Sequence, residues 1–535
     1  MEKVELQATL MPLGLPEIFK RIYYSLYSNS NLPRAERLSA EMTRLLFCKI
    51  YDEENNHDSP EFQIREGENC DQTASRIREL FEMVKKSFPD AFDENERLHL
   101  DNRSIVYVIS QLQQFDLKNS SRDVISESFQ AFLGPGMRGE KGQFFTPKNV
   151  VRLCVKMLDP KKNERIIDPA CGSGGFLVEC IAHLGETLNN NDVKKQAFLN
   201  IFGIDKEADL SKICKAYMSI IGDGHSNVFN SDSLTNANWS KEMNDKIKDQ
   251  SFDVVMTNPP FGAKISIGDR AILERYNLGH KWIKTPPNDW KMTSNLTRNE
   301  APQILFIEKC LQLLRPGGRM AIVLPDGIFG NGMHSYVLQY IFQEAKVLAI
   351  VSLAPEAFMP GTHTKTSVLF LENRGHDSDL KDYDIFMAIA YKVGHDKNGN
   401  TTYKMNDRGE YLFDHGNRII DDELPEVTKR FRLFVNKGLN DYNHLGFTIK
   451  FSDVKNSILI PGYYDPEIKT ELEELASTGR FSLSSIGDLC KNGVISVRRG
   501  NEVGSKYYGM GEVPFVRTTD IVNWEIKIDR NRGMH

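Results

Sequence analysis

Apolar residues recur at helical spacing through the first part of the chain. One such run occupies every third or fourth position, at Leu38, Met42, Leu45, Leu46 and Ile50. This period places the apolar side chains on one face of a helix. Runs of β-branched residues are few here, so residues 1–140 are predicted to form a helical N-terminal domain. The polar, acidic stretch 52–68 within it is predicted to be a solvated connector.

From about residue 164 the pattern changes to short apolar strands that alternate with helical segments. Strands are predicted at residues 165–168, 202–205, 227–232, 252–258, 320–325, 348–353 and 367–373, and helices at 176–187, 208–221 and 302–314. The last helix is expected to end at the turn Arg315-Pro316-Gly317-Gly318. This alternation is typical of a parallel sheet covered by helices on both faces. A doubly wound α/β domain is therefore predicted over residues 141–395.

The rest of the chain is more polar. Residues 396–480 are predicted to be a connecting region, with a hairpin turn at Asn398-Gly399 and a helix at 466–477. Residues 481–535 carry short apolar segments between turn residues, which predicts small strands and turns.

Charge and cysteine content narrow the classes of function. The net charge of −6 over 535 residues lacks the basic excess of a protein that binds a polyanion over its whole surface. Any contact with nucleic acid is therefore expected to be local or shared with a more basic partner. The 8 cysteines show no zinc-ligand spacing, so no metal site is expected.

The chain also lacks the sequence features of a membrane or secreted protein. No apolar run approaches the ~20 residues needed to span a bilayer, and the first residues do not have the layout of a secretory signal. We expect no membrane partner and a cytoplasmic location.

A glycine-rich loop follows the first predicted strand, from Asp168 through Ala170, Gly172, Ser173 and Gly174 to Gly175. In an open α/β sheet, ligands bind beyond the carboxyl ends of the strands, and glycines there allow a ligand to approach the next helix closely. A dinucleotide is disfavoured, because Leu177 stands where its fingerprint needs a third glycine and because Asp168 would repel a pyrophosphate.

Two further carboxylates follow the next two strands, Asp205 and Asp232. Three carboxylates around one glycine loop favour S-adenosylmethionine over a dinucleotide as the bound cofactor. Asp168 suits its cationic groups, Asp205 its ribose hydroxyls and Asp232 its adenine amino group. Taken singly, each aspartate has a less favoured alternative role as a helix cap or a turn residue.

The fourth predicted strand runs into Asn258-Pro259-Pro260-Phe261. Two prolines make this backbone rigid and leave its carbonyls directed outward. The Asn258 side-chain oxygen and the Pro259 carbonyl can accept both hydrogens of an aromatic amine and so localise its lone pair. Phe261 can stack on a base that has left its duplex. An Asn-Pro-Pro loop alone is unremarkable, but its place after the fourth strand predicts methyl transfer to an exocyclic amine.

Taken together, these segments resemble the N6-adenine DNA methyltransferases, and specifically the modification subunit of type I restriction-modification systems. The resemblance covers roughly residues 15–375. It includes a segment that looks like the family's cofactor-binding segment, made of Gln143, Phe144, Phe145, Thr146, Pro147 and Lys148. Ser173, Gly174, Gly175 and Asp205 match other cofactor positions, and Asn258 to Phe261 match the catalytic motif.

The resemblance implies a Rossmann-like S-adenosylmethionine-dependent methyltransferase that modifies N6 of adenine at specific sites in double-stranded DNA. It also implies a specificity subunit, a second methyltransferase subunit and a restriction subunit as partners. The chain has no Walker loop, so we expect it to methylate without cutting. Residues 486–521 look like the opening of a target-recognition domain, and 481–535 are expected to be a partial segment of that kind.

Two alternatives stay open. The methyl acceptor can instead be a glutamine amide in protein or a base amine in RNA, because both present planar N–H groups. The chain can also be a catalytically silent DNA-binding or scaffold subunit. A further hypothesis concerns the long segment 262–300, rich in Trp, Lys and Arg, which is expected to contact the DNA strand that bears the target adenine.

Overall fold

The computed structural model describes most of the chain as two compact units, 1–467 and 468–535. The described residues are 14–32, 35–56, 59–89, 91–117, 145–188, 191–221, 227–262, 265–286, 289–375, 382–439, 441–455 and 457–497, with four two-residue strands beyond them. Among the helices in these ranges, none is both long enough and apolar enough to cross a membrane. The predicted division into four domains stays a prediction.

The first unit begins with the helices α1 (Leu15–Asn29), α2 (Ala35–Asn55), α3 (Cys70–Ser87) and α4 (Asn102–Leu112), in the region predicted to be helical. The apolar positions that predicted α2 are buried. Local polar groups fix where the next helices begin. Asn69 forms a capping box with Gln72 at the start of α3, and Asp101 accepts a hydrogen bond from the Ser104 amide at the start of α4. The helical character of this region is confirmed.

The acidic stretch 52–68 differs from the prediction of a solvated connector. Asp52 lies inside α2 and is only 3% exposed. Its carboxylate accepts hydrogen bonds from the amides of Glu61 and Phe62, at 2.9 and 2.8 Å. This contact folds the loop back onto the helix and buries the Phe62 ring. Phe62, a single aromatic in a polar run, therefore belongs to the core of the helical region.

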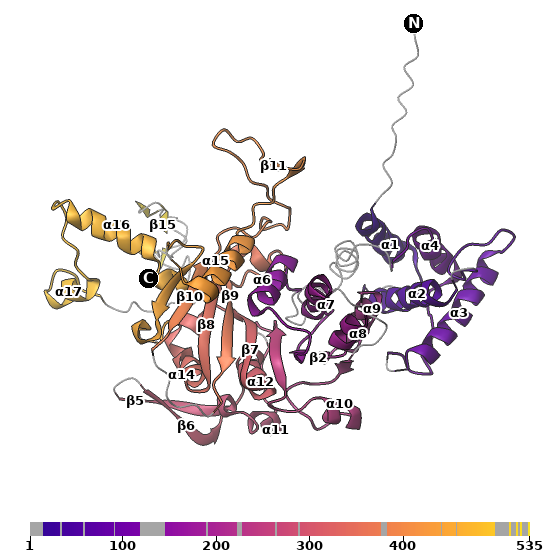
Figure 1. The fold of residues 1–535 in the computed structure, drawn as a ribbon, viewed down its shortest axis with the longest axis horizontal. Helices are drawn as coiled ribbons and strands as arrows, with labels where there is room; N and C mark the ends of the chain where they lie inside the picture. The colour runs from indigo at the N-terminus through magenta and orange to yellow at the C-terminus, as the bar shows by residue number, and fades with distance from the viewer. Residues whose placement is uncertain are drawn as a thin grey trace, which may run out of the picture. The chain divides into compact units, whose positions relative to one another are not determined.

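A nine-stranded mixed sheet forms the centre of the first unit, in the order β13-β10-β8-β9-β7-β4-β1-β2-β3 (Figure 1). Its strands are β1 (Ile166–Asp168), β2 (Ile201–Asp205), β3 (Asn227–Asn230), β4 (Phe252–Thr257), β7 (Leu314–Pro325), β8 (Ala345–Ser352), β9 (Thr366–Asn373), β10 (Asp384–Ile389) and β13 (Phe447–Lys450). All seven predicted strands are confirmed. β10 and β13 were not predicted, and β9 and β13 run antiparallel to their neighbours.

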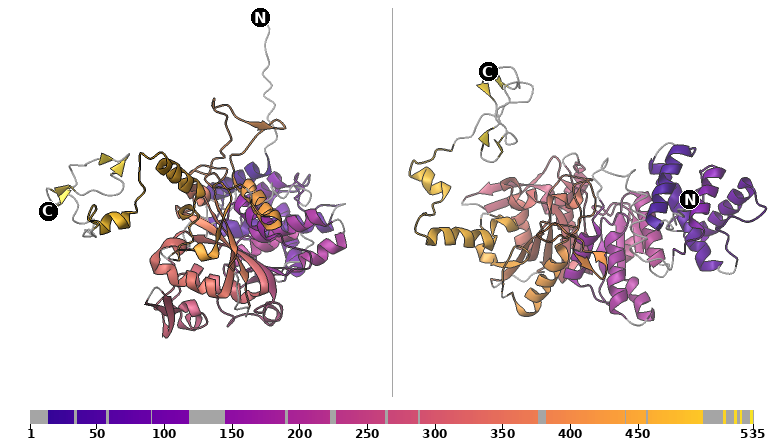
Figure 2. Two further views of the ribbon diagram at one scale, coloured as in Figure 1. Left: turned by 60° about the vertical axis from the view of Figure 1, so that its left-hand side comes forward. Right: turned by 90° about the horizontal axis from the view of Figure 1, so that it is seen from above.

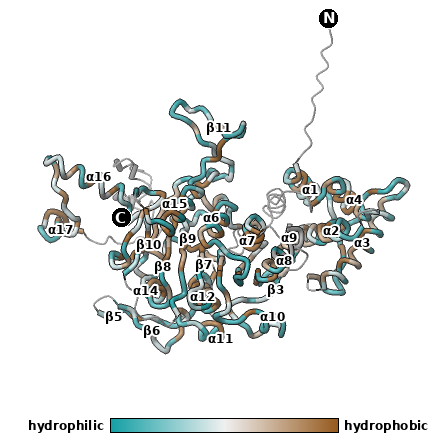
Figure 3. Tube along the Cα trace, in the orientation of Figure 1, coloured by the Kyte–Doolittle hydropathy of each residue, from teal (hydrophilic) through white to brown (hydrophobic). Residues whose placement is uncertain are grey.

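Helices cover both faces of this sheet, as the doubly wound prediction requires. They are α6 (Lys148–Leu158), α7 (Gly175–Thr187), α8 (Asn191–Phe198), α9 (Ala208–Ile221), α10 (Lys241–Lys246), α12 (Pro302–Leu313), α14 (Ser335–Glu344) and α15 (Leu424–Lys437). Strand side chains alternate between two cores. Val254 packs with the core that holds α6, α7 and α9, and Val255 packs with the core that holds α12 and α14. Figure 2 shows the helices on either side of the strands, and Figure 3 shows apolar stretches along the central strands.

Two turns refine the predictions. α12 ends at Leu313, and the predicted turn Arg315 to Gly318 is an irregularity inside β7, where Gly317 has a φ of 74°. The turn at Asn398-Gly399 is confirmed, with Gly399 at a φ of 83° and its amide bonded to the Asp396 carbonyl. It belongs to an arm of short antiparallel pairs that carries β11 (Phe413–Asp414) and β12 (Asn417–Arg418).

The segment 262–300 folds into α11 (Arg270–Leu273), a short 3-10 turn and the hairpin of β5 (His280–Thr285) and β6 (Asp289–Leu296). After β7 the chain forms the short helix α13 (Gly327–Gly330) before α14.

The second unit begins within the predicted helix, α16 (Pro466–Ser477). It also contains a helix that the sequence did not predict, α17 (Ile486–Lys491), which Ser485 caps through the Asp488 amide. Four two-residue strands pair as β14 with β17 and β15 with β16. The expectation of strands and turns alone from residue 481 is therefore corrected by α17.

The Asp52 contact gives the first prediction. Asp52→Ala removes the acceptor of two loop amides and leaves Phe62 less well held. We expect the free energy of unfolding, measured by urea titration, to fall by about 2 kcal/mol. The control Asp245→Ala, at an exposed position of α10, should change it by less than about 0.5 kcal/mol. Equal effects of the two variants would show that the buried carboxylate does not hold the loop.

Candidate active site

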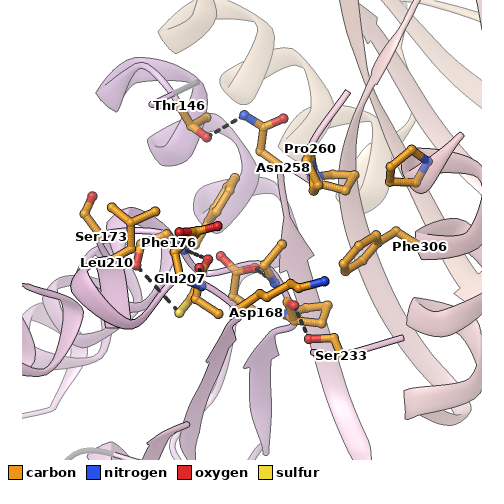
Figure 4. Close-up of a pocket in the computed structure, with 18 of the residues that line it drawn as sticks. Thr146, Asp168, Ser173, Phe176, Glu207, Leu210, Ser233, Asn258, Pro260 and Phe306 are labelled. Carbon is orange, nitrogen blue, oxygen red and sulfur yellow. Dashed lines mark hydrogen bonds between the residues drawn. The ribbon is translucent and has the colours of Figure 1, made fainter. Parts of the chain in front are cut away.

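A cavity of about 330 Å³ opens at the carboxyl ends of β1, β2 and β4. The chain order on the sheet reverses here, because β2 and β3 lie to one side of β1 while β4 and β7 lie to the other. Crevices at such a reversal are the usual ligand sites of open α/β sheets. The walls come from the glycine loop, the segments after β2 and β3, the tetrapeptide after β4, and the start of α12 (Figure 4).

Most of the predicted site residues line this one cavity. They are Phe145, Thr146, Asp168, Ala170, Gly172, Ser173, Gly175, Asp205, Asp232, Asn258, Pro259, Pro260 and Phe261. Gly174, Pro147 and Lys148 are described but do not line it. Gln143 and Phe144 lie outside the described residues. The topology therefore brings together side chains that are more than one hundred residues apart in sequence.

Asp168 is the most deeply buried carboxyl group of the cavity, at 1% exposure. It ends β1 and accepts a hydrogen bond from the Ala170 amide at 3.0 Å. Burial penalises the charged form and raises the pKa of Asp168 to about 7. Near neutral pH the Asp168 carboxyl group is therefore only partly ionised, and a cationic group placed in the cavity would favour its charged form.

Asp205 holds the glycine loop in place. It ends β2, and its two oxygens accept hydrogen bonds from the amides of Gly172 and Glu207, at 2.8 and 2.9 Å. Burial raises its pKa. This bracing contact was not predicted from the sequence, because it joins residues 33 positions apart. Glu207, two residues further on, also lines the cavity and offers a second carboxylate there.

Asp232 lies two residues beyond the end of β3 and also lines the cavity. Its Oδ2 atom pairs with the Lys206 ammonium at 3.0 Å, and its Oδ1 atom accepts the Leu234 amide at 3.0 Å. These contacts fix the carboxylate on the rim that separates the ends of β2 and β3.

Gly174 acts through packing. It has a φ of 92°, and a Cβ atom there would lie 2.6 Å from the Cys214 sulfur on α9. The absence of a side chain thus allows the left-handed backbone conformation just before α7 and the close packing of α9 against the loop. This explains why a predicted cofactor residue does not face the cavity.

The tetrapeptide leaves β4 directly at the cavity wall. The Asn258 Nδ2 atom donates a hydrogen bond to the Thr146 hydroxyl at 3.1 Å, so the segment before α6 meets the end of β4 (Figure 4). Among the described residues, the Pro259 carbonyl accepts no hydrogen bond. Phe261 is 1% exposed and packs edge-to-face on Phe358, with ring centroids 6.2 Å apart.

Several lining residues were missed by sequence reasoning, among them Glu207, Leu210, Leu234, Ile267 and Phe306. The four apolar ones were not singled out from the sequence. Nothing in their spacing separates a core side chain from one that lines a cavity, because both are apolar and mostly buried. Glu207 had a usable signal, since it follows a strand end at the sheet edge where ligands bind.

The hairpin of β5 and β6 is anchored by the tryptophans that suggested a DNA contact. Trp290 donates its ring N–H to the Ser335 hydroxyl at 2.9 Å, and Trp282 packs on Tyr336 at 6.0 Å between centroids. Both tryptophans therefore bind the hairpin to α14. Lys281, Lys284 and Lys291 remain exposed on it.

Sequence comparison identifies a protein family that matches this chain. A model described as N-6 DNA Methylase matches residues 120–412, more than half of the 535 residues. The chain is 29% identical over 293 residues to the methylase subunit of the type I restriction enzyme EcoEI of Escherichia coli, covering 54% of each chain. It is 25% identical over 407 residues to the MjaIX methylase subunit of Methanocaldococcus jannaschii, covering 72% of this chain and 65% of that one. The chain thus spans about half to two thirds of the length of these relatives.

Solved structures share the fold. One, from a type I R-M system, has a TM-score of 0.56 at 19% identity and covers 89% of this chain and 98% of that chain. Another, the methyltransferase subunit of a type I restriction-modification system from Streptococcus thermophilus, has a TM-score of 0.55 at 14% identity and covers 84% and 98%. The matched family region contains the glycine loop, Asp205 and Asn258 to Phe261. The chain therefore belongs to the N-6 DNA Methylase family.

Proposed function

We propose that this chain is the modification subunit of a type I restriction-modification system, and that it transfers a methyl group from S-adenosylmethionine to N6 of adenine in double-stranded DNA. One observation carries the proposal. The tetrapeptide Asn258 to Phe261 lies on the wall of the same cavity as the glycine loop. The acceptor oxygens for an amine and the proposed methyl-donor site are then adjacent. The reaction would take place in the cytoplasm.

The lining of the cavity fits this cofactor. Carboxylates surround a space that also has apolar walls, which suits a ligand with cationic groups, a diol and a flat base. In the proposal, Asp168 faces the cationic end, Asp205 and Glu207 the ribose hydroxyls, and Asp232 the adenine amino group. Phe306 contributes an apolar wall. The segment from Gln143 to Lys148 would hold the methionine end, and within it Thr146 accepts a hydrogen bond from Asn258 of the tetrapeptide. When bound, the cofactor supplies an electrophilic methyl group.

Catalysis would depend on two oxygen acceptors. An aromatic amine is a weak nucleophile because its lone pair is delocalised into the ring. Asn258 Oδ1 and the Pro259 carbonyl would accept its two hydrogens and favour a tetrahedral nitrogen. Each hydrogen bond to the developing positive charge is worth on the order of 1.5–3 kcal/mol. The proline-locked backbone keeps the carbonyl in position without further reorganisation. No strong base is needed, since the methylated nitrogen loses its proton readily.

The target base would have to leave the duplex to reach the cavity. Pro260 and Phe261 would border the base on the cavity wall. Because Phe261 is already packed on Phe358, its ring is held in place before a base arrives. A preset ring would lower the cost of unstacking the adenine from its neighbours.

The two alternatives are weaker. Methylation of a protein amide or of RNA needs the same two acceptors, but the curated relatives are restriction enzyme methylase subunits. A catalytically silent scaffold subunit would not require the glycine loop and the tetrapeptide to line the same cavity. Incubation with labelled cofactor and unmethylated DNA, RNA or protein separates the acceptors directly.

Recognition of a DNA site would be shared with other chains. The net charge of −6 gives the protein little general affinity for a polyanion. In the proposal, a specificity subunit reads the sequence, a second copy of the methyltransferase subunit completes the modifying complex, and a restriction subunit joins it. The hairpin lysines Lys281, Lys284 and Lys291 would add a local contact to DNA phosphates.

Replacing the amide tests the catalytic role. Asn258→Ala removes one acceptor, so we expect the methylation rate constant to fall by at least about 100-fold. The dissociation constant for S-adenosylmethionine, measured by calorimetry, should stay within about threefold. The control Asn295→Ala, on the exposed part of β6, should leave both unchanged. An Asn258→Ala protein that methylates at the original rate would refute this mechanism.

The raised pKa of Asp168 predicts a pH dependence of cofactor binding. Below pH 7 the free carboxyl group is largely protonated, and a bound cation favours its ionised form, so the affinity should rise with pH and level off above the pKa of about 7. We expect at least a tenfold gain between about pH 5.5 and about pH 7.5. Asp168→Asn should bind weakly and without this slope. A slope that is identical in both proteins would argue against a cation at Asp168.

The proposed contact between the hairpin and DNA can be tested by the salt dependence of DNA affinity. Replacing Lys281, Lys284 and Lys291 with Gln should weaken binding to a DNA duplex and reduce the slope of log affinity against log salt by about 2 to 3. The matched variant replaces Lys162, Lys397 and Lys437, which are exposed elsewhere on the first unit. The same change in slope for both variants would remove the hairpin from the DNA contact.

A further inference from the structure

We infer that Thr146 is a positioning residue that decides which end of the Asn258 amide faces the target amine. The inference rests on the proposed function and deepens it, because it concerns how the acceptor oxygen is selected. It starts from one contact, the hydrogen bond from Asn258 Nδ2 to Thr146 Oγ1 at 3.1 Å. Figure 4 shows the amide oxygen on the side of the group that points away from Thr146.

An asparagine amide has two ends of similar shape and opposite chemistry. Its oxygen accepts hydrogen bonds, and its nitrogen donates them. Only the oxygen can hold an amino hydrogen of adenine. If the amide turned over, Nδ2 would meet the N–H groups of the base, and donor would face donor. The orientation of Asn258 therefore determines whether the proposed chemistry is available.

The backbones on both sides of this contact are firmly held. Thr146 precedes Pro147, the N-cap residue of α6, and α6 is buried along most of its length. Asn149, on the first turn of α6, donates a hydrogen bond to the Val393 carbonyl at 2.9 Å. On the other side, Asn258 follows a buried strand and precedes two prolines. Because both backbones are fixed, the main freedom left to the Asn258 side chain is a rotation that exchanges its amide nitrogen and oxygen.

A hydroxyl group can both accept and donate, so the contact alone permits either amide orientation. The choice is settled by where the single Thr146 proton goes. Thr146 lines the cavity, and the amino-acid carboxylate of the proposed cofactor is an acceptor only. A hydroxyl that donates its proton to that carboxylate must accept from Asn258, which turns Nδ2 toward Thr146 and Oδ1 away from it. Cofactor binding would thus fix the amide in its productive orientation.

Three variants separate positioning from binding. Thr146→Val keeps the shape but removes the hydroxyl, and we expect kcat at saturating cofactor to fall by about 10- to 100-fold. Thr146→Ser keeps the hydroxyl and should stay within about threefold of the parent. In the Asn258→Ala background, Thr146→Val should have almost no further effect on kcat, because the amide that it orients is gone. The control Thr428→Val, on α15, should leave kcat unchanged.

A second readout does not depend on turnover. The side-chain amide signals of Asn258 can be identified in protein labelled with 15N-asparagine, because Asn258→Ala removes them. In the parent protein, S-adenosylhomocysteine should shift these signals and slow their exchange with solvent. In Thr146→Val both changes should be lost, while Thr146→Ser should retain them.

The outcomes distinguish the inference from the proposed function. If the parent protein methylates adenine and Thr146→Val changes only the cofactor KM, the positioning role is wrong and the function stands. The same conclusion follows if Thr146→Val slows the parent and the Asn258→Ala protein by equal factors. If the parent methylates no adenine in DNA, the proposed function fails, and the amide signals alone then decide whether Thr146 orients Asn258.

Discussion

The parallel pairing of β1 with both β2 and β4 is the constraint on which the candidate site depends. Ile166 pairs with Ile201 on one side and with Val254 on the other, and this register sets the carboxyl ends of three strands side by side. Each strand then delivers a different group to one edge of the sheet. The glycine loop follows β1, a carboxylate ends β2, and the tetrapeptide follows β4. A shift of one residue in either of these pairings would turn all the side chains of the shifted strand to the opposite face.

Polar groups are buried at this edge at some cost to stability. Asp168 and Asp205 both have raised pKa values because their charged forms are poorly solvated. Asp205 offsets part of that cost by accepting two backbone amides, and in doing so it shapes the glycine loop. Asp168 has one such amide partner, from Ala170. Asp168, whose pKa burial raises to about 7, is the carboxyl group that we assign to the cationic part of the cofactor, because a bound cation would stabilise its charged form.

Much of this architecture could be predicted from sequence. The seven predicted strands follow from apolar runs, and the convergence of Asp168, Asp205 and Asn258 follows from their places at strand ends. Sequence could not predict the hydrogen bond between Thr146 and Asn258, because it joins segments 112 residues apart through side chains alone. It also missed β10 and β13, which complete the sheet edge, and it misjudged Asp52 and the two hairpin tryptophans. Asp52 and Trp290 are fixed by hydrogen bonds to distant residues, which local patterns do not encode.

A structure of the protein bound to S-adenosylhomocysteine and a DNA duplex with an extrahelical adenine tests the central claim most directly, with the specificity partner present if binding requires it. We predict that the exocyclic nitrogen of the adenine lies within hydrogen-bond distance, about 2.7–3.2 Å, of both Asn258 Oδ1 and the Pro259 carbonyl oxygen. The cofactor sulfur should then lie on the opposite side of that nitrogen, over the glycine loop. An adenine bound with its amino group directed away from these oxygens, or a cofactor bound outside the cavity, would contradict the account.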